Sequence, residues 1–170
     1  MKRDDTMAET TVNNTYESTG TPVYSHTQRG TAIIVLLLLT MGGMTVMVYF
    51  TADTVAVMIL VPLLAILAIS LLLFHSLTVS IDGENVNISF GVRAIKKKFR
   101  LQDIEACTCV TNPVIFGLGI HKIPGGWIYN VSGLEAVELN MRGEGIVRIG
   151  TDEPQKLCEA IEKARNEAYG

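Results

Sequence analysis

The sequence predicts a two-helix transmembrane hairpin followed by a mainly β domain, a small curled sheet or barrel that a C-terminal α-helix closes at one end. Three observations predict this arrangement. Two uninterrupted apolar runs lie close together, alternating apolar and polar residues recur after them, and the last residues carry one apolar stripe at helical spacing. Of the 170 residues, 48% are hydrophobic and 18% are charged, and their clustering excludes a purely soluble or wholly disordered chain.

The apolar runs cover residues 31–50 and 55–74, and within 31–74 Asp53 is the only charged residue. Each run has about 20 residues, which as a helix spans roughly the 30 Å hydrocarbon core of a bilayer. The short connection between the runs leaves room only for a tight turn, so we expect an antiparallel hairpin. Because neither run contains a charged residue, the hairpin indicates an anchor and not an ion path.

Lysine and arginine near the membrane ends predict the orientation of the chain. Arg29 precedes the first run, five basic residues fall between 93 and 100, and the connecting loop carries only Asp53. We therefore expect a multi-pass cell-membrane protein with both termini in the cytoplasm. The chain has three cysteines, too few for a disulfide framework, which favours free thiols in a reducing compartment.

Residues 1–30 are rich in Thr, Asn, Ser and Glu and poor in large aliphatic side chains. A segment of this kind buries too little apolar surface to offset the entropy that it loses on ordering. The sequence therefore predicts a disordered cytoplasmic tail over 1–30, the hairpin over 31–74 and a cytoplasmic domain over 75–170.

The first strands of the domain are predicted by alternation. Residues 77–81 and 86–90 alternate apolar and polar side chains around an Asp-Gly pair, a strong signal for a β-hairpin. The alternation resumes at 98–101, and 104–110 provides a further strand. Residues 136–149 alternate again on both sides of a turn, which predicts a second hairpin. The strands between 104 and 131 are not delimited by the pattern.

A helix is predicted from residue 154 onward. Thr151 and Asp152 can accept hydrogen bonds from free N–H groups, and a proline at 154 is tolerated in the first helical turn. Four apolar residues then follow at helical spacing: Leu157, Ile161, Ala164 and Ala168. A helix with one apolar face needs a surface to cover, so we expect it to close the mouth of the β domain.

Four stretches carry a resemblance to a known family: FGLGIH at 116–121, GWIYNVSG at 126–133, AVEL at 136–139 and RIGTDEP at 148–154. With the preceding hairpin they resemble bacterial pleckstrin-homology (PH)-like membrane proteins over residues 31–168. The resemblance implies a PH-like barrel of about seven antiparallel strands capped by a C-terminal α-helix, and it implies no catalytic residues. His121 departs from the family pattern, in which arginine is frequent.

The leading candidates for binding a lipid or a partner are five basic residues after the second apolar run: Arg93, Lys96, Lys97, Lys98 and Arg100. No acidic residue interrupts them, and each cation near an anionic bilayer contributes about 1 kcal/mol. The alternative is a solvated strand face or a topology signal. An acidic chain without aromatic residues among these cations does not fit nucleic-acid binding.

Three further candidates follow in a glycine-rich stretch. His121 and Lys122 are placed to contact an anion, the alternative being an exposed loop histidine. Trp127 is a candidate for stacking on a ligand, the alternative being an inward strand residue or a rim residue.

Cys107 and Cys109 lie two residues apart and would place both sulfur atoms on one strand face, which suits a soft metal. A closed zinc site needs two more ligands, and only His121 and Cys158 are at hand, in no recognised spacing. The sequence therefore predicts no metal, no cofactor and no catalytic group.

We expect from these features a membrane-anchored PH-like interaction module that binds a protein partner or anionic lipid headgroups at the cytoplasmic membrane surface, with self-association as a further option. Two alternatives stay open. One is a structural or regulatory subunit of a larger membrane complex that acts through the hairpin. The other is a metal protein or enzyme centred on Cys107, Cys109 and His121.

Overall fold

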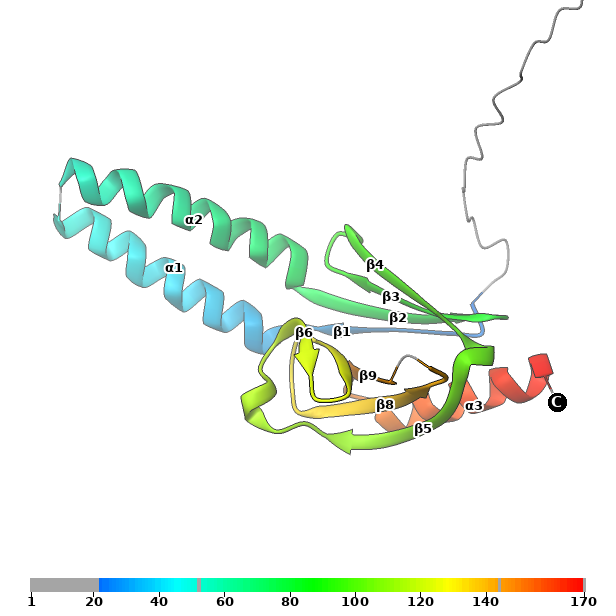
Figure 1. Ribbon diagram of the computed structural model, residues 1–170. Helices are drawn as coiled ribbons and strands as arrows, with labels where there is room; N and C mark the ends of the chain where they lie inside the picture. Colours follow the sequence, from blue (N-terminus) through cyan, green and yellow to red (C-terminus); the bar gives the residue numbers. More distant parts are fainter. Residues whose placement is uncertain (1–21, 52, 144, 170) are drawn as a thin grey trace, which may run out of the picture.

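The computed structural model describes residues 22–51, 53–143 and 145–169. Figure 1 shows a pair of long helices leaving one end of a mainly β region. The helices are α1 (Thr31–Thr51), α2 (Thr54–Phe74) and α3 (Pro154–Tyr169), with short 3-10 helices η1 (Leu101–Asp103) and η2 (Val114–Phe116). The strands are β1 (Tyr24–Arg29), β2 (Ser76–Asp82), β3 (Asn85–Phe90), β4 (Ile95–Arg100), β5 (Ile104–Thr111), β6 (Gly119–Ile123), β7 (Gly126–Asn130), β8 (Glu135–Met141) and β9 (Gly145–Gly150).

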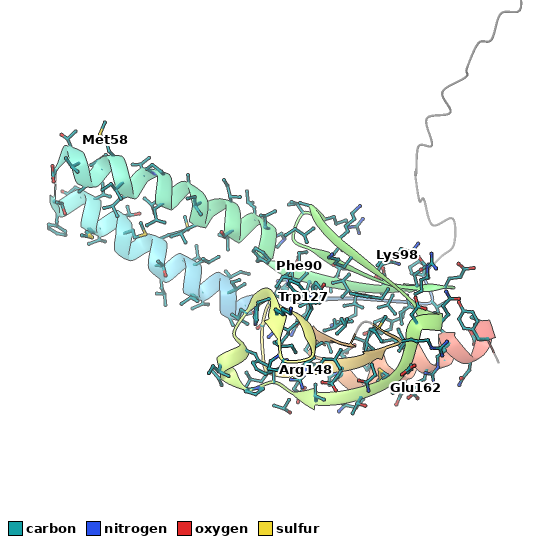
Figure 2. All side chains as sticks on the ribbon, viewed as in Figure 1. Met58, Phe90, Lys98, Trp127, Arg148 and Glu162 are labelled. Carbon is teal, nitrogen blue, oxygen red and sulfur yellow. A yellow bond between two sulfur atoms is a disulfide. The ribbon has the colours of Figure 1, made fainter. Side chains whose placement is uncertain are left out.

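The two apolar runs form helices α1 and α2 as expected. Each helix has 21 residues and is long and apolar enough to cross a membrane, and neither contains a buried residue. Asp53 caps α2, because its carboxylate accepts a hydrogen bond from the Val55 amide at 3.1 Å. Figure 2 shows Met58 at the end of the pair farthest from the β region. Helices with exposed apolar side chains all round need an apolar environment that the described chain does not supply.

Part of the expected disordered tail is a strand. Residues 1–21 lie outside the described residues, but β1 pairs antiparallel with β2, from Tyr24 opposite Ile81 to Arg29 opposite Ser76. The expectation of disorder is therefore wrong for 24–29, because a polar strand at a sheet edge needs few apolar side chains. Gln28 is buried there, and its amide donates to the Ser132 carbonyl at 3.1 Å. The β region thus begins before the hairpin, which is inserted between two neighbouring strands.

The strands form two open sheets and not the expected closed barrel of about seven antiparallel strands. Among the described residues, sheet A has the order β1-β2-β3-β4 and sheet B the order β5-β8-β9-β7-β6. The chain passes from the edge strand β4 to the edge strand β5 through η1, so the two sheets end there without joining. β7 and β9 pair in parallel. The predicted hairpins β2–β3 and β8–β9 are confirmed.

The core lies between the inner faces of the sheets and α3. Inward residues of β2 and β3, such as Leu77, Ile81 and Phe90, are fully buried. α3 packs on η1, β2, β5 and β8, and it buries Leu157, Ile161 and Ala164 of the predicted stripe while Ala168 stays exposed. The helix predicted to cover the β region therefore does so along the opening between the two sheets.

A disulfide joins Cys107 on β5 to Cys158 on α3, with Cα atoms 5.8 Å apart. The expectation of free thiols is therefore wrong for these two cysteines, while Cys109 is free and exposed. The two partners are separated by 51 positions, and only the packing of α3 on β5 brings them together. The bond ties the covering helix to sheet B and closes a long loop, which restricts the unfolded chain.

The insertion of the hairpin between paired strands predicts that the β region folds without it. Arg29 lies opposite Ser76, and the Gly30 amide donates to the His75 carbonyl at 2.8 Å. Deleting residues 31–74 leaves Gly30 and His75 as a two-residue connection with glycine first, as in a type II′ hairpin. We expect this form to be soluble and to unfold cooperatively in circular dichroism.

A fragment of residues 75–170, which lacks β1, is the matched comparison. Its thermal midpoint should be several degrees lower than that of the form lacking residues 31–74. Without β1 the edge of β2 has no paired strand, and the position of the buried Gln28 is empty. Equal midpoints for the two forms would show that β1 contributes nothing to the fold.

Candidate functional site

The outer face of sheet A is polar from one edge to the other. Because alternate residues of β2 and β3 are buried in the core, the intervening side chains point away from sheet B. The register aligns them in rows across the strands. The rows are Thr27, Thr78, Ser89 and Lys96; then Ser25, Ser80, Asn87 and Lys98; then Asp82, Asn85 and Arg100. Figure 2 shows Lys98 on this face.

A shallow groove of about 500 Å³ follows this face. Among the described residues, its lining contains four basic side chains and a single carboxylate, that of Asp82. The basic side chains are Arg93, Lys96, Lys97 and Lys98, and the hydroxyl groups come from Ser25, Thr78, Ser80 and Ser89. Hydroxyl, ammonium and guanidinium groups all donate hydrogen bonds, so the groove suits an anionic, oxygen-rich group such as a phosphate.

Asp82 is held in place by its neighbours. Its carboxylate accepts hydrogen bonds from the Asn85 amide at 3.0 Å and from the Asn87 side chain at 2.8 Å. Partial burial acts to raise the pKa of Asp82, but these hydrogen bonds and the nearby charge of Lys98 outweigh it, so the pKa lies below its usual value. The ionised carboxylate therefore offsets part of the charge of Lys98, and the excess positive charge belongs to Arg93, Lys96 and Lys97.

The basic strand runs away from the hairpin. β2 begins two residues after α2 ends, and the register places Lys96 level with Thr78 and Arg100 level with Asp82. Figure 1 shows the β3–β4 turn beside the end of α2 and the end of β4 near the far side of the β region. The cations are therefore graded in their distance from the helices, with Arg93 and Lys96 nearest.

Gly91 fixes the turn between β3 and β4 against α2. A Cβ atom at this position would overlap the backbone carbonyls of Leu72 and Leu73, so only glycine permits the close approach. The Gly91 amide also donates to the Ser76 carbonyl at 2.8 Å. Arg93 follows with a φ of 64°, and its amide donates to the Phe90 carbonyl at 2.8 Å. These contacts hold the turn that carries Arg93 against the last turn of α2.

The structure separates the remaining candidates from this groove. Arg100 lies at the far end of β4 in a second depression with Glu84 and Tyr169. His121 and Lys122 lie on β6, and Trp127 lies opposite Lys122 on β7, all in sheet B. Lys122 is exposed, whereas the Nε2 atom of His121 is buried.

The hydroxyl groups of the groove were not among the predicted site residues. Thr78, Ser80 and Ser89 occupy the polar positions of the two alternating strands, so the signal was present in the sequence. Ser25 could not be assigned, because its strand was not predicted.

Trp127 is 47% exposed, as a rim residue would be, while the next residue, Ile128, is fully buried.

The cysteine and histidine residues do not form a metal centre. Cys107 is bonded to Cys158 and therefore offers no thiolate, and the described part of the chain contains no group of three His, Cys, Asp or Glu residues that could hold a metal ion.

Comparison with protein-family models, with curated proteins and with solved structures gives no match for this chain.

The network around Asp82 predicts a pH-dependent stability. Because the pKa of Asp82 is lowered on folding, the carboxylate stabilises the fold above the unfolded pKa of about 4, and this contribution is lost as the pH falls through the folded value. We expect Asp82→Asn to cost about 1 kcal/mol near pH 7, allowing for solvent screening. Denaturant unfolding at pH 7 and pH 3 measures the cost, and an equal cost at both values would contradict this role.

Proposed function

We propose that this protein is a membrane-anchored interaction module. In this proposal α1 and α2 cross the membrane, and the basic end of sheet A binds anionic lipid headgroups of the same bilayer. The observation that carries the proposal is the position of Arg93 and Lys96. Both line the polar groove, and both lie at the end of the sheet where α2 enters it.

Distance decides which cations reach the headgroups. The apolar helix ends at Phe74, and Lys96 is level with Thr78, about 13 Å farther along an extended strand. The headgroup layer occupies about 5–8 Å of that length, so the Lys96 ammonium lies within about one Debye length, roughly 8 Å, of the surface. Arg100 is level with Asp82, about 26 Å beyond the helix, where its charge is screened.

We also propose that both ends of the chain lie in the cytoplasm. Basic residues flank the hairpin on the side of the β region, whereas the connection between the helices carries only Asp53. The disulfide removes the support that free cysteines were expected to give, so this orientation rests on the distribution of charge alone.

A membrane-impermeant thiol reagent applied outside the cell should label Thr51→Cys and leave the native Cys109 unlabelled. The reverse labelling would invert the orientation.

The headgroup proposal predicts a measurable lipid preference. The full chain is reconstituted in phosphatidylcholine with a trace of spin-labelled phosphatidylserine or phosphatidylcholine, and the immobilised fraction of each is compared at low salt. We expect the anionic lipid to be preferred. Arg93→Gln and Lys96→Gln should each lower the preference by up to about fivefold, which corresponds to about 1 kcal/mol per cation. Added salt should weaken the preference in the same way.

Arg100→Gln is the matched control, because it removes the same charge from the same strand at the far end. It should leave the lipid preference nearly unchanged. A loss as large as that of Lys96→Gln would show that position relative to α2 does not matter. If the unaltered protein shows no preference at all, the headgroup proposal fails and the groove becomes a candidate for a protein partner.

Three earlier expectations stay predictions. The resemblance to bacterial PH-like membrane proteins has no match to support it, and the proposal here depends only on the groove and the hairpin. Self-association of the chain is open. A role as a subunit of a larger membrane complex also stays open, because the apolar surfaces of α1 and α2 are exposed and available to other helices as well as to lipid.

A further inference from the structure

Several large apolar side chains outside the hairpin are exposed on loops of the β region. Val114 and Ile115 in η2 are 77% and 89% exposed, and Val92 in the β3–β4 turn is 63% exposed. Leu134, in the loop between β7 and β8, is 43% exposed. Such exposed apolar side chains would be stabilised by contact with another apolar phase if their loops lie at one end of the β region.

Local contacts hold η2 so that two of its three side chains face outward. The Phe116 ring lies under the Arg148 guanidinium, with 5.5 Å between the guanidinium carbon and the ring centroid. Arg148 is itself fixed, since it donates to the Glu138 carboxylate at 2.7 Å and to the Asn112 side chain at 3.1 Å. Phe116 is therefore attached to sheet B, and the preceding Val114 and Ile115 are left projecting.

The loops that carry these side chains lie at the hairpin end of the β region. Gly91, next to Val92, packs against the carbonyls of the last turn of α2. In the β7–β8 loop, the Ser132 hydroxyl accepts a hydrogen bond from the Ala32 amide in the first turn of α1 at 3.4 Å. The Asn112 amide donates to the Leu134 carbonyl at 2.6 Å and so connects this loop to the segment leading into η2. Figure 1 shows the β5–β6 connection reaching toward the hairpin side.

We propose that Val92, Val114 and Ile115 insert into the interface of the bilayer that α1 and α2 cross. The occupant of this apolar rim is lipid, because its loops contact the ends of two apolar helices. The β3–β4 turn does so directly at Gly91, and η2 does so through the hydrogen bonds of Asn112 and Ser132. Apolar side chains at such a position are buried about 5–10 Å deep, at the boundary of headgroups and acyl chains. The rim holds the β region against the membrane without requiring anionic lipid. This inference rests on the proposed membrane span of the hairpin.

Depth-dependent quenching tests the insertion in the full chain. Cys109→Ser removes the free thiol, because Cys107 and Cys158 are joined in the disulfide. Single cysteines are then introduced by Ile115→Cys or Val92→Cys and labelled with nitrobenzoxadiazole. The vesicles contain only phosphatidylcholine, so the basic strand contributes no attraction. At both positions we expect the emission to lie at shorter wavelength than that of the same label in water. We also expect a loss of fluorescence with a nitroxide lipid whose spin label lies near the headgroups.

Two labelled positions serve as controls. Leu39→Cys lies within α1 and should be quenched by a nitroxide deep in the acyl chain, whereas Glu162→Cys on α3 should not be quenched. Quenching at 39 without quenching at 115 and 92 overturns the insertion and leaves the hairpin proposal intact. Absence of quenching at 39 overturns both proposals. Equal quenching at 115 and 162 also overturns the insertion, because contact with lipid would then not be confined to the rim.

Discussion

The antiparallel pairing of β1 with β2 is the constraint on which the rest of the structure depends. It brings the two ends of the inserted hairpin to the spacing of neighbouring strands, about 4.8 Å, although residues 29 and 76 are far apart in sequence. A single residue separates β1 from α1, and another separates α2 from β2. No flexible linker therefore lies between hairpin and sheet, so the direction of the helices determines which end of the β region faces a membrane.

Two different forces would act at that end. The charges of Arg93 and Lys96 reach across water to about a Debye length and depend on the lipid headgroup, whereas Val114 and Ile115 stabilise only by direct burial. In this proposal the charges favour one class of lipid, and the apolar rim favours any bilayer. Sheet A contributes the charges and Val92, and sheet B contributes Val114 and Ile115, because both sheets present loops on the hairpin side. The disulfide between Cys107 and Cys158 then keeps α3 on sheet B.

The helices and strands that were predicted correctly are those whose residue pattern lies within one continuous segment of the chain. The apolar runs gave α1 and α2, the alternation around Asp82 gave β2 and β3, and the stripe through Leu157 and Ile161 gave α3. β1 was missed because its polar residues serve as an edge strand whose partner lies beyond the hairpin. The disulfide, the parallel pairing of β7 with β9 and the open sheets depend on contacts between distant segments, which no local pattern encodes. For the same reason the basic residues were found, but their grading by distance from the hairpin was not.

The central claim is that β4 runs outward from the bilayer surface, and collision of spin labels with a nickel-chelating lipid headgroup tests it most directly. Labels are placed in turn at Arg93, Lys96, Lys98 and Arg100 of the full chain in vesicles, and the relaxation caused by the nickel is compared. The register predicts that relaxation is strongest at 93 and falls in order to 100. Equal relaxation along the strand, or relaxation that increases toward 100, would contradict the claim.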